Sequence, residues 1–280
     1  MGFLRPRGSE GTGERKRGLR IFLSLFSILT LVGGFFSPRN CYGQVIPFGA
    51  GEDFQYQIKW NLFRGGRLSF SVADDVYIDG ERAFHLIAET ETEGIFRRFY
   101  PYKAKVESFP SKHDFFPLRY HFSSWSPEET ILEVVKYHRG QRKGNWVQEK
   151  YEDGKKRVKE EEFSVAEYLQ DPLSIIYYLR TQDFEVGDNI EVPLSVDRKE
   201  CRIMVKVLRK SKIRIMGETR DAFILEPGLF IKGVPFQRGS LWIWFSADEE
   251  RIPLYFTARA ALGVVSATLI KIKRPSEKKG

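Results

Sequence analysis

Apolar and polar residues alternate along most of the chain with a period of two, which is the pattern of β-strands with one buried face. The first clear run covers residues 54–60, where Phe, Tyr, Ile and Trp are separated by single polar residues. Turn signals such as Gly65-Gly66 and Asp79-Gly80 separate the runs and are typical of β-hairpins. The pattern predicts consecutive antiparallel strands.

The same alternation predicts many further strands. They are expected at residues 68–72, 83–89, 103–109, 118–125, 130–138, 145–151, 190–196, 202–208, 212–216, 222–226, 240–245, 254–260 and 264–272. Residues 94–100 break the alternation and indicate a loop or a short helix. Residues 155–162 are strongly charged and indicate a solvated edge strand or loop. Such a chain tends to curl or close, because curvature or closure protects the edges of a large sheet.

One stretch departs from this pattern and predicts a helix. Asp171 suits its N-cap, Pro172 its first position and Arg180 its last turn, where the helix dipole favours a cation. Apolar residues cover it nearly all round, with Leu173, Ile176 and Tyr177 on one face and Ile175, Tyr178 and Leu179 on the others. Such a helix is expected to be buried. A capping-box pattern from Ser164 to Glu167 predicts a short helical turn before it, so the helical segment is expected over 164–181.

Signals on the two sides of this helix recur in the same order. Gly51-Glu52 matches Gly187-Asp188, and Pro117-Leu118 matches Pro253-Leu254, both at an offset of 136 residues. The order predicts two diverged copies of one β unit, over about 51–160 and 187–272, with the helix at their junction. The alternative is that hairpins of similar length reuse glycine and proline by chance. We expect one large curved sheet, a barrel or half-barrel, with the helix on its concave face.

The first 43 residues have the composition of a secretory signal peptide. Several arginines precede an uncharged, mostly apolar run over residues 21–36, and Cys41 and Gly43 provide small residues at the −3 and −1 positions. Cleavage between Gly43 and Gln44 is predicted, which leaves a single domain over 44–280. The alternative is an uncleaved signal anchor.

Residues 1–43 carry seven of the 45 basic and two of the 37 acidic side chains, so the remaining net charge is only +3. This balance gives nucleic-acid binding little support.

Motifs for catalysis and metal binding are absent from the sequence. His85, His113, His121 and His138 fall on different predicted strands or loops, and no HExxH, CxxC, GxSxG or phosphate-binding loop occurs. Cys201, the one cysteine after the signal, is expected to be a buried small hydrophobe and has no partner for an internal disulfide. No catalytic residue, metal site or cofactor is therefore predicted, although a triad could in principle assemble from distant strands.

The helix supplies the candidate binding residues. Asp171 is expected to act as a helix cap, and Arg180 either to stabilise the helix end or to hold an anionic headgroup at a cavity mouth. Tyr177 either belongs to the core or lines an amphiphile site, since its ring is apolar and its hydroxyl can donate. Leu173 and Ile176 complete the proposed ligand-binding set.

Several of these residues together resemble a known family. The matching stretches are Gly51-Glu52-x-x-x-Tyr56, Gly80-x-x-Ala83-Phe84-His85, Pro117-Leu118-Arg119, Asp171-Pro172-Leu173-Ser174-x-x-Tyr177-Tyr178-Leu179-Arg180 and Arg251-Ile252-Pro253. They resemble the exported bacterial proteins grouped as domain of unknown function 3108. The resemblance implies a location in the envelope of a Gram-negative-type bacterium, with the periplasm expected, and transfers no catalytic residue. The expected fold is also similar in outline to periplasmic half-barrel lipoprotein carriers, which by itself implies no function.

The expected function is non-enzymatic binding of a lipid or lipidated protein on the concave surface, with the helix as lid or floor. Membrane contact would be transient or through an uncleaved signal. One alternative is a structural or adaptor protein with a filled core, whose partners bind at a sheet edge by strand addition. The third is a hydrolase-type enzyme without a recognisable motif. An apolar cavity beside residues 173–179 distinguishes the first hypothesis from the second.

Overall fold

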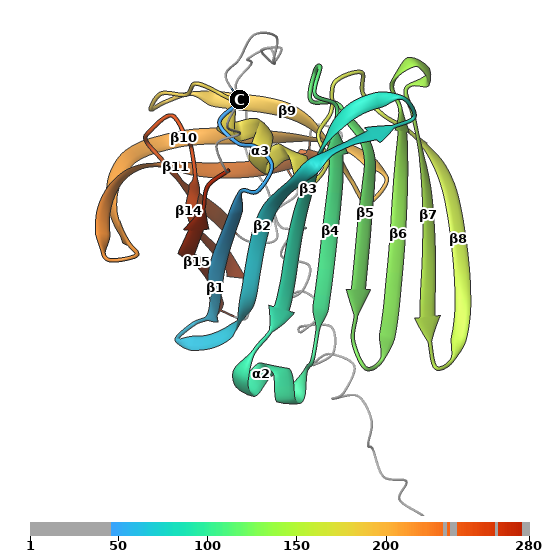
Figure 1. Cartoon of the computed structure of the whole chain (residues 1–280), viewed down its shortest axis with the longest axis horizontal. Helices are drawn as coiled ribbons and strands as arrows, with labels where there is room; N and C mark the ends of the chain where they lie inside the picture. The colour runs from blue at the N-terminus through green and yellow to red at the C-terminus, as the bar shows by residue number, and fades with distance from the viewer. Residues whose placement is uncertain (1–45, 232–233, 236–239, 261–262, 276–280) are drawn as a thin grey trace, which may run out of the picture.

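A single curved antiparallel sheet forms the body of the protein (Figure 1). The computed structural model describes residues 46–231, 234–235, 240–260 and 263–275, so the predicted signal peptide and its cleavage site lie outside the described residues. The sheet order is β8-β7-β6-β5-β4-β3-β2-β1-β15-β14-β13-β11-β10-β9, with β12 paired to β11. The two ends of this order do not pair with each other. The predicted all-β fold with one central helix is confirmed, and its form is an open half-barrel.

The strands of the first half are β1 (Asp53–Trp60), β2 (Phe63–Ile78), β3 (Glu81–Thr92), β4 (Lys103–Pro110), β5 (Pro117–Trp125), β6 (Glu129–His138), β7 (Lys143–Glu152) and β8 (Lys155–Ser164). Those of the second half are β9 (Asn189–Val196), β10 (Lys199–Ile215), β11 (Glu218–Ile231), β12 (Val234–Pro235), β13 (Ser240–Ser246), β14 (Pro253–Ala260) and β15 (Gly263–Lys273). The helices are α2 (Gly94–Phe99), η2 (Arg139–Gln141) and α3 (Ser174–Arg180). The pairing of β1 with β15 joins the two halves into one sheet.

The two halves repeat one plan. Strands β9, β10, β11, β13, β14 and β15 begin 134 to 137 residues after β1, β2, β3, β4, β5 and β6, in that order. Equivalent backbone hydrogen bonds also recur. The Gly51 N–H donates to Val72 O at 2.8 Å, and the Gly187 N–H donates to Val207 O at 2.8 Å. The duplicated plan predicted from sequence is therefore present in the hydrogen bonding as well as in the order of elements.

The hairpin of β7 and β8 has no counterpart among the described residues of the second half, and it explains why the sheet stays open. Since β15 pairs with β1, closure of the repeated plan would require β6 to pair with β9. The hairpin occupies that edge of β6 instead. The connector after β8 reaches β9 at one point, where the Gln170 N–H donates to Pro193 O at 2.8 Å and the Ser195 N–H donates to Gln170 O at 2.9 Å.

Side chains also meet across the gap between β8 and β9, which we call the seam. Arg198, in the turn between β9 and β10, places its Nε 2.8 Å from Glu161 Oε2 on β8. Its guanidinium lies over the Trp146 ring of β7, 4.1 Å from the ring centroid. A cation held against an aromatic face and a carboxylate contributes modestly at such a partly exposed site. The two edge strands of the sheet, β8 and β9, are therefore connected by the side-chain contacts of Arg198 and by the backbone hydrogen bonds of Gln170 to β9.

The predicted helical segment over 164–181 is wrong in its first part. Ser164 is the last residue of β8 and pairs with Lys143, and the Val165 N–H donates to Arg142 O at 3.0 Å. Only Ser174–Arg180 is helical in this region. The segment continues the sheet in place of the helical turn that its capping-box pattern predicted, because Phe163 and Val165 are buried against β7 and its neighbours in a small separate core.

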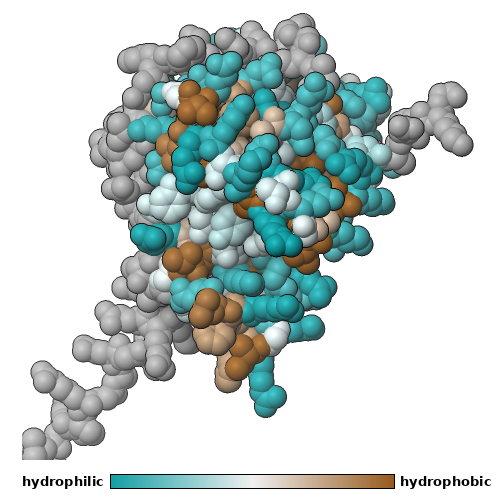
Figure 2. Space-filling view, turned by 90° about the vertical axis from the view of Figure 1, so that its left-hand side faces the viewer, coloured by the Kyte–Doolittle hydropathy of each residue, from teal (hydrophilic) through white to brown (hydrophobic). Residues whose placement is uncertain are grey.

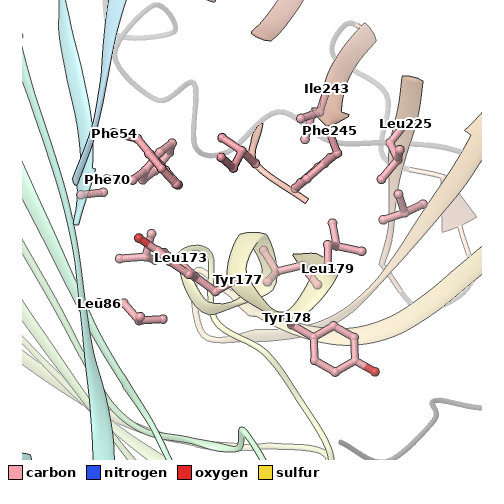
Figure 3. Packing of buried hydrophobic residues seen from close by; sticks show 14 of the residues in the cluster. Phe54, Phe70, Leu86, Leu173, Tyr177, Tyr178, Leu179, Leu225, Ile243 and Phe245 are labelled. Atoms are coloured by element: carbon pink, nitrogen blue, oxygen red, sulfur yellow. The ribbon is translucent and has the colours of Figure 1, made fainter. Parts of the chain in front are cut away.

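The main core lies on the concave side of the sheet, around α3. Six of the seven α3 residues are buried, which confirms the expectation from the apolar residues on every side of the helix. Figure 3 shows α3 between two parts of the sheet, with Leu173 and Tyr177 on the side of Phe70 and Leu86 and Leu179 on the side of Leu225. The helix thereby fills one part of the half-barrel and leaves the rest of its interior to be lined by strands.

Candidate functional site

Asp171 fixes the start of α3 and connects it to the sheet. Its Oδ1 accepts hydrogen bonds from the N–H groups of Leu173 and Ser174, both at 2.8 Å, so its side chain caps the first turn. The predicted position is corrected, because α3 begins at Ser174 and Leu173 holds the N-cap position. Its Oδ2 accepts a hydrogen bond from Ser108 Oγ of β4 at 2.5 Å. The side chain is fully buried, and burial raises the pKa of Asp171 to about 6, although these hydrogen bonds oppose the shift.

Arg180 forms a buried bidentate ion pair at the other end of α3. Its Nη1 lies 2.5 Å from Glu52 Oε1 and its Nη2 lies 2.9 Å from Glu52 Oε2. The remaining donors reach the carbonyl oxygens of Pro47 and Glu250, both at 3.2 Å. Burial raises the pKa of Glu52 from its usual value, and the Arg180 guanidinium opposes that shift. Arg180 thus makes four hydrogen bonds to the protein itself, and each of its three nitrogens takes part.

Tyr177 and Leu173 belong to the packed core. The Tyr177 ring meets the Phe48 ring edge-on, with 5.0 Å between centroids, and Leu173 is completely buried. The Tyr177 hydroxyl oxygen has no hydrogen-bond partner among the described residues. Burial raises the pKa of this hydroxyl far above its usual value. These two side chains hold α3 to β1, β2 and β3 and do not face open space.

An apolar cavity lies beside α3, within the concave side of the sheet. Its volume is about 200 Å³. Helix residues Ile175, Ile176 and Leu179, with Pro172 before them, form one wall. Strands of both halves supply the rest: Ile58, Gly65, Gly66, Leu68, Phe70, Thr90, Glu91, Thr92, Tyr102, Leu194, Val196, Ile203, Pro227, Leu229, Leu241, Ile243, Phe256, Ala258, Val265, Ser266 and Ala267. Such a cavity is the type of site that holds a small apolar ligand.

The structure divides the predicted binding residues between the core and the cavity. Ile176 lines the cavity, whereas Leu173, Tyr177 and Arg180 do not. The expectation of Arg180 at a cavity mouth is corrected by its burial, at 2% exposure, against Glu52. The helix turns Tyr177 toward Phe48 and Arg180 toward Glu52, on a segment whose path could not be predicted from local patterns. Sequence reasoning missed Ile175, Leu179 and the strand residues, although the inward positions of each alternating run contain them.

The side chains that line the cavity are mostly apolar. Glu91 and Tyr102 are the only ionisable residues in the described lining, and they lie near the end of β3 and the start of β4. Elsewhere, His85 Nε2 lies 2.8 Å from Glu107 Oε1 on the outer side of the sheet, in a partly buried hydrogen bond. Within the described ranges no three His, Cys, Asp or Glu side chains are arranged to hold a metal ion.

The family model for proteins of unknown function, DUF3108, matches residues 55–270, which is most of the chain. The chain belongs to this family. The match includes α3 and nearly the whole sheet, so the cavity lies within the part that defines the family. A search of curated proteins finds no match. No helix among the described residues is long and apolar enough to cross a bilayer.

Solved structures that are similar to this DUF3108 protein have low sequence identity to it. A β-barrel-like protein of domain of unknown function DUF1849 from Brucella abortus is 11% identical, with a TM-score of 0.51, covering 82% of this chain and 99% of that one. A candidate exported protein with a YmcC-like fold from Bacteroides fragilis is 8% identical, with a TM-score of 0.35 and the same coverage. A candidate lipoprotein from Parabacteroides distasonis is 6% identical, with a TM-score of 0.31 and the same coverage. The first of these supports the barrel-like fold.

Proposed function

We propose that this protein is exported to the periplasm and binds an apolar or amphiphilic ligand, a lipid or the acyl part of a lipidated protein, without enzymatic activity. The observation that carries the proposal is the apolar cavity beside α3. Its lining combines the inner faces of both halves of the sheet with Ile175, Ile176 and Leu179. The composition of residues 1–43 supports export.

The position of α3 makes it the floor of the site. In Figure 1, α3 lies at one end of the half-barrel and α2 at the other. The polar lining residues Thr90 and Thr92 end β3, directly before α2. An amphiphile would enter with its polar head toward this end and its chain toward α3. Each buried methylene contributes roughly 0.8 kcal/mol, so a chain of moderate length gives useful affinity after the cost of association.

A structural or adaptor function is less well supported by the free edges. Strand β8 forms one edge, and all its residues except Phe163 are exposed and mostly charged, which disfavours pairing with another strand. Strand β9, at the other edge, is bonded in part by Gln170. The presence of a cavity also contradicts a completely filled core.

We expect the chain from Gln44 onward to copurify with lipid that solvent extraction and mass spectrometry detect. The substitution Ile176→Trp should fill part of the cavity and weaken binding of a fluorescent fatty acid about tenfold, the equivalent of roughly two lost methylene contacts at about 0.8 kcal/mol each. The matched control is Ile270→Trp, since Ile270 is 46% exposed and lies outside the described cavity lining. Unchanged fatty-acid affinity in Ile176→Trp, or no bound lipid and no fatty-acid binding in the unmodified protein, would contradict the proposal.

A further inference from the structure

Large apolar side chains are exposed together at the α2 end of the half-barrel. Leu62 is 91% and Phe63 66% exposed at the turn between β1 and β2, and Ile95 is 61% and Phe99 77% exposed on α2. Figure 2 shows apolar surface at the lower end of the molecule, the end at which this turn and α2 lie in Figure 1. Contiguous exposed apolar side chains mark contact sites for membranes or other proteins.

The turn and α2 form one surface, which we call the tip and define as residues 59–66 and 94–100. The rings of Trp60 and Phe96 are in contact, with 5.7 Å between their centroids. The Glu93 N–H, directly before α2, donates to Gly65 O at 3.1 Å. The exposed apolar residues of the two segments therefore project from a tip that is fixed by the fold.

The tip is also basic. Lys59, Arg64, Arg97 and Arg98 are exposed, and residues 59–66 and 94–100 contain no Asp or Glu. Within the part of the chain that the structure describes, none of these four cations has an ion pair. The neighbouring Glu93 carboxylate is held by Arg67, whose Nε lies 2.6 Å from Glu93 Oε1. Exposed cations beside exposed apolar groups thus face solvent without compensating negative charge.

We propose that the tip docks on the surface of an anionic phospholipid bilayer. Leu62, Phe63 and Phe99 would enter the boundary between headgroups and acyl chains, and Arg97 and Arg98 would contact phosphate groups. The charge also argues against a second copy of the chain as the occupant, because two basic tips repel each other.

The tip adjoins the cavity through Gly65 and Gly66, which line it and directly follow Arg64. Docking would therefore bring this end of the cavity to the membrane. The docking proposal does not depend on the proposed ligand, since the exposed apolar and basic residues lie outside the cavity. The docking proposal adds the tip as a second binding surface and an anionic bilayer as its partner.

Cosedimentation with vesicles tests the proposal, with the chain from Gln44 onward used so that the predicted signal peptide does not itself insert. The protein should bind vesicles of phosphatidylcholine with phosphatidylglycerol and bind pure phosphatidylcholine vesicles more weakly. The double substitution Leu62→Ser/Phe99→Ser should lower the association constant about tenfold or more. Arg97→Glu/Arg98→Glu should lower binding to the anionic vesicles by at least about fivefold per arginine.

The matched control is Tyr77→Ser, because Tyr77 is 72% exposed but lies near the far end of β2. It should bind vesicles like the unmodified protein. The proposal is overturned if the unmodified protein does not bind anionic vesicles, or if both tip variants bind as it does. A dimer in sedimentation velocity that Leu62→Ser/Phe99→Ser dissociates, without loss of vesicle binding, would assign the tip to self-association instead. Lipid extraction from this variant separates the two proposals, since loss of docking should leave cavity occupancy unchanged.

Discussion

Replacing Arg180 by methionine is expected to lower the free energy of unfolding by about 3–5 kcal/mol. Arg180 and Glu52 are buried to 1% and 3% side-chain exposure, so removal of the guanidinium leaves the carboxylate buried without its partner. The variant also loses the contacts of the guanidinium with the rings of Phe48 and Phe54, at 5.2 and 5.1 Å from their centroids. Urea denaturation followed by tryptophan fluorescence measures the change.

The matched control for this prediction is Arg274→Met. Arg274 forms a similar two-bond pair with Glu250, at 2.7 and 2.8 Å, but the side chains are 55% and 36% exposed. Such exposed pairs typically contribute about 1 kcal/mol or less. An equal loss of stability in the two variants would show that burial of the Arg180 pair has no special effect.

The stability contributed by Asp171 is expected to fall as the pH rises. Its pKa is about 6 in the folded protein and 3.8 is its ordinary value, so the folded protein binds this proton more tightly than the unfolded chain does. The contribution is complete below about pH 4 and is lost as the pH rises through about 6. A difference of about 2 pKa units corresponds to about 3 kcal/mol.

Comparison with Asp171→Asn isolates this effect from other carboxyl groups. The asparagine oxygen can still accept from the N–H groups of Leu173 and Ser174 but does not titrate. The free energy of unfolding of the unmodified protein, minus that of the variant, should rise by about 2–3 kcal/mol between about pH 8 and pH 4. A difference that does not change with pH would mean that the folded pKa of Asp171 is not raised.

The strand pattern and the helix were predictable because each depends on local sequence. Alternating residues marked the inward faces, and the apolar coverage of residues 173–179 indicated a buried helix. The duplicated plan was also predictable, since turn signals at constant offsets reflect strands of equal length. The helical turn predicted at 164–167 is wrong because Phe163 and Val165 are buried in the small core against β7. That burial depends on residues outside the segment and outweighs a local capping pattern.

The division of α3 between core and cavity was not predictable for a different reason. A helix that is apolar on all sides gives no indication of which side meets solid core. That choice depends on Phe48 and Glu52, which approach α3 from more than 120 residues away along the chain. For the same reason, Arg180 could be read either as a headgroup ligand or as a structural residue until its partner was known.

The unpaired seam between β8 and β9 has a mechanical consequence. In a closed barrel the circumference is set by a continuous ladder of backbone hydrogen bonds. Here the circumference is completed by Gln170 bonding to β9 and by Arg198 lying against Glu161 and Trp146. Widening the gap between β8 and β9 would break these few contacts and leave every strand ladder intact, so the circumference is held less firmly there than in a closed barrel.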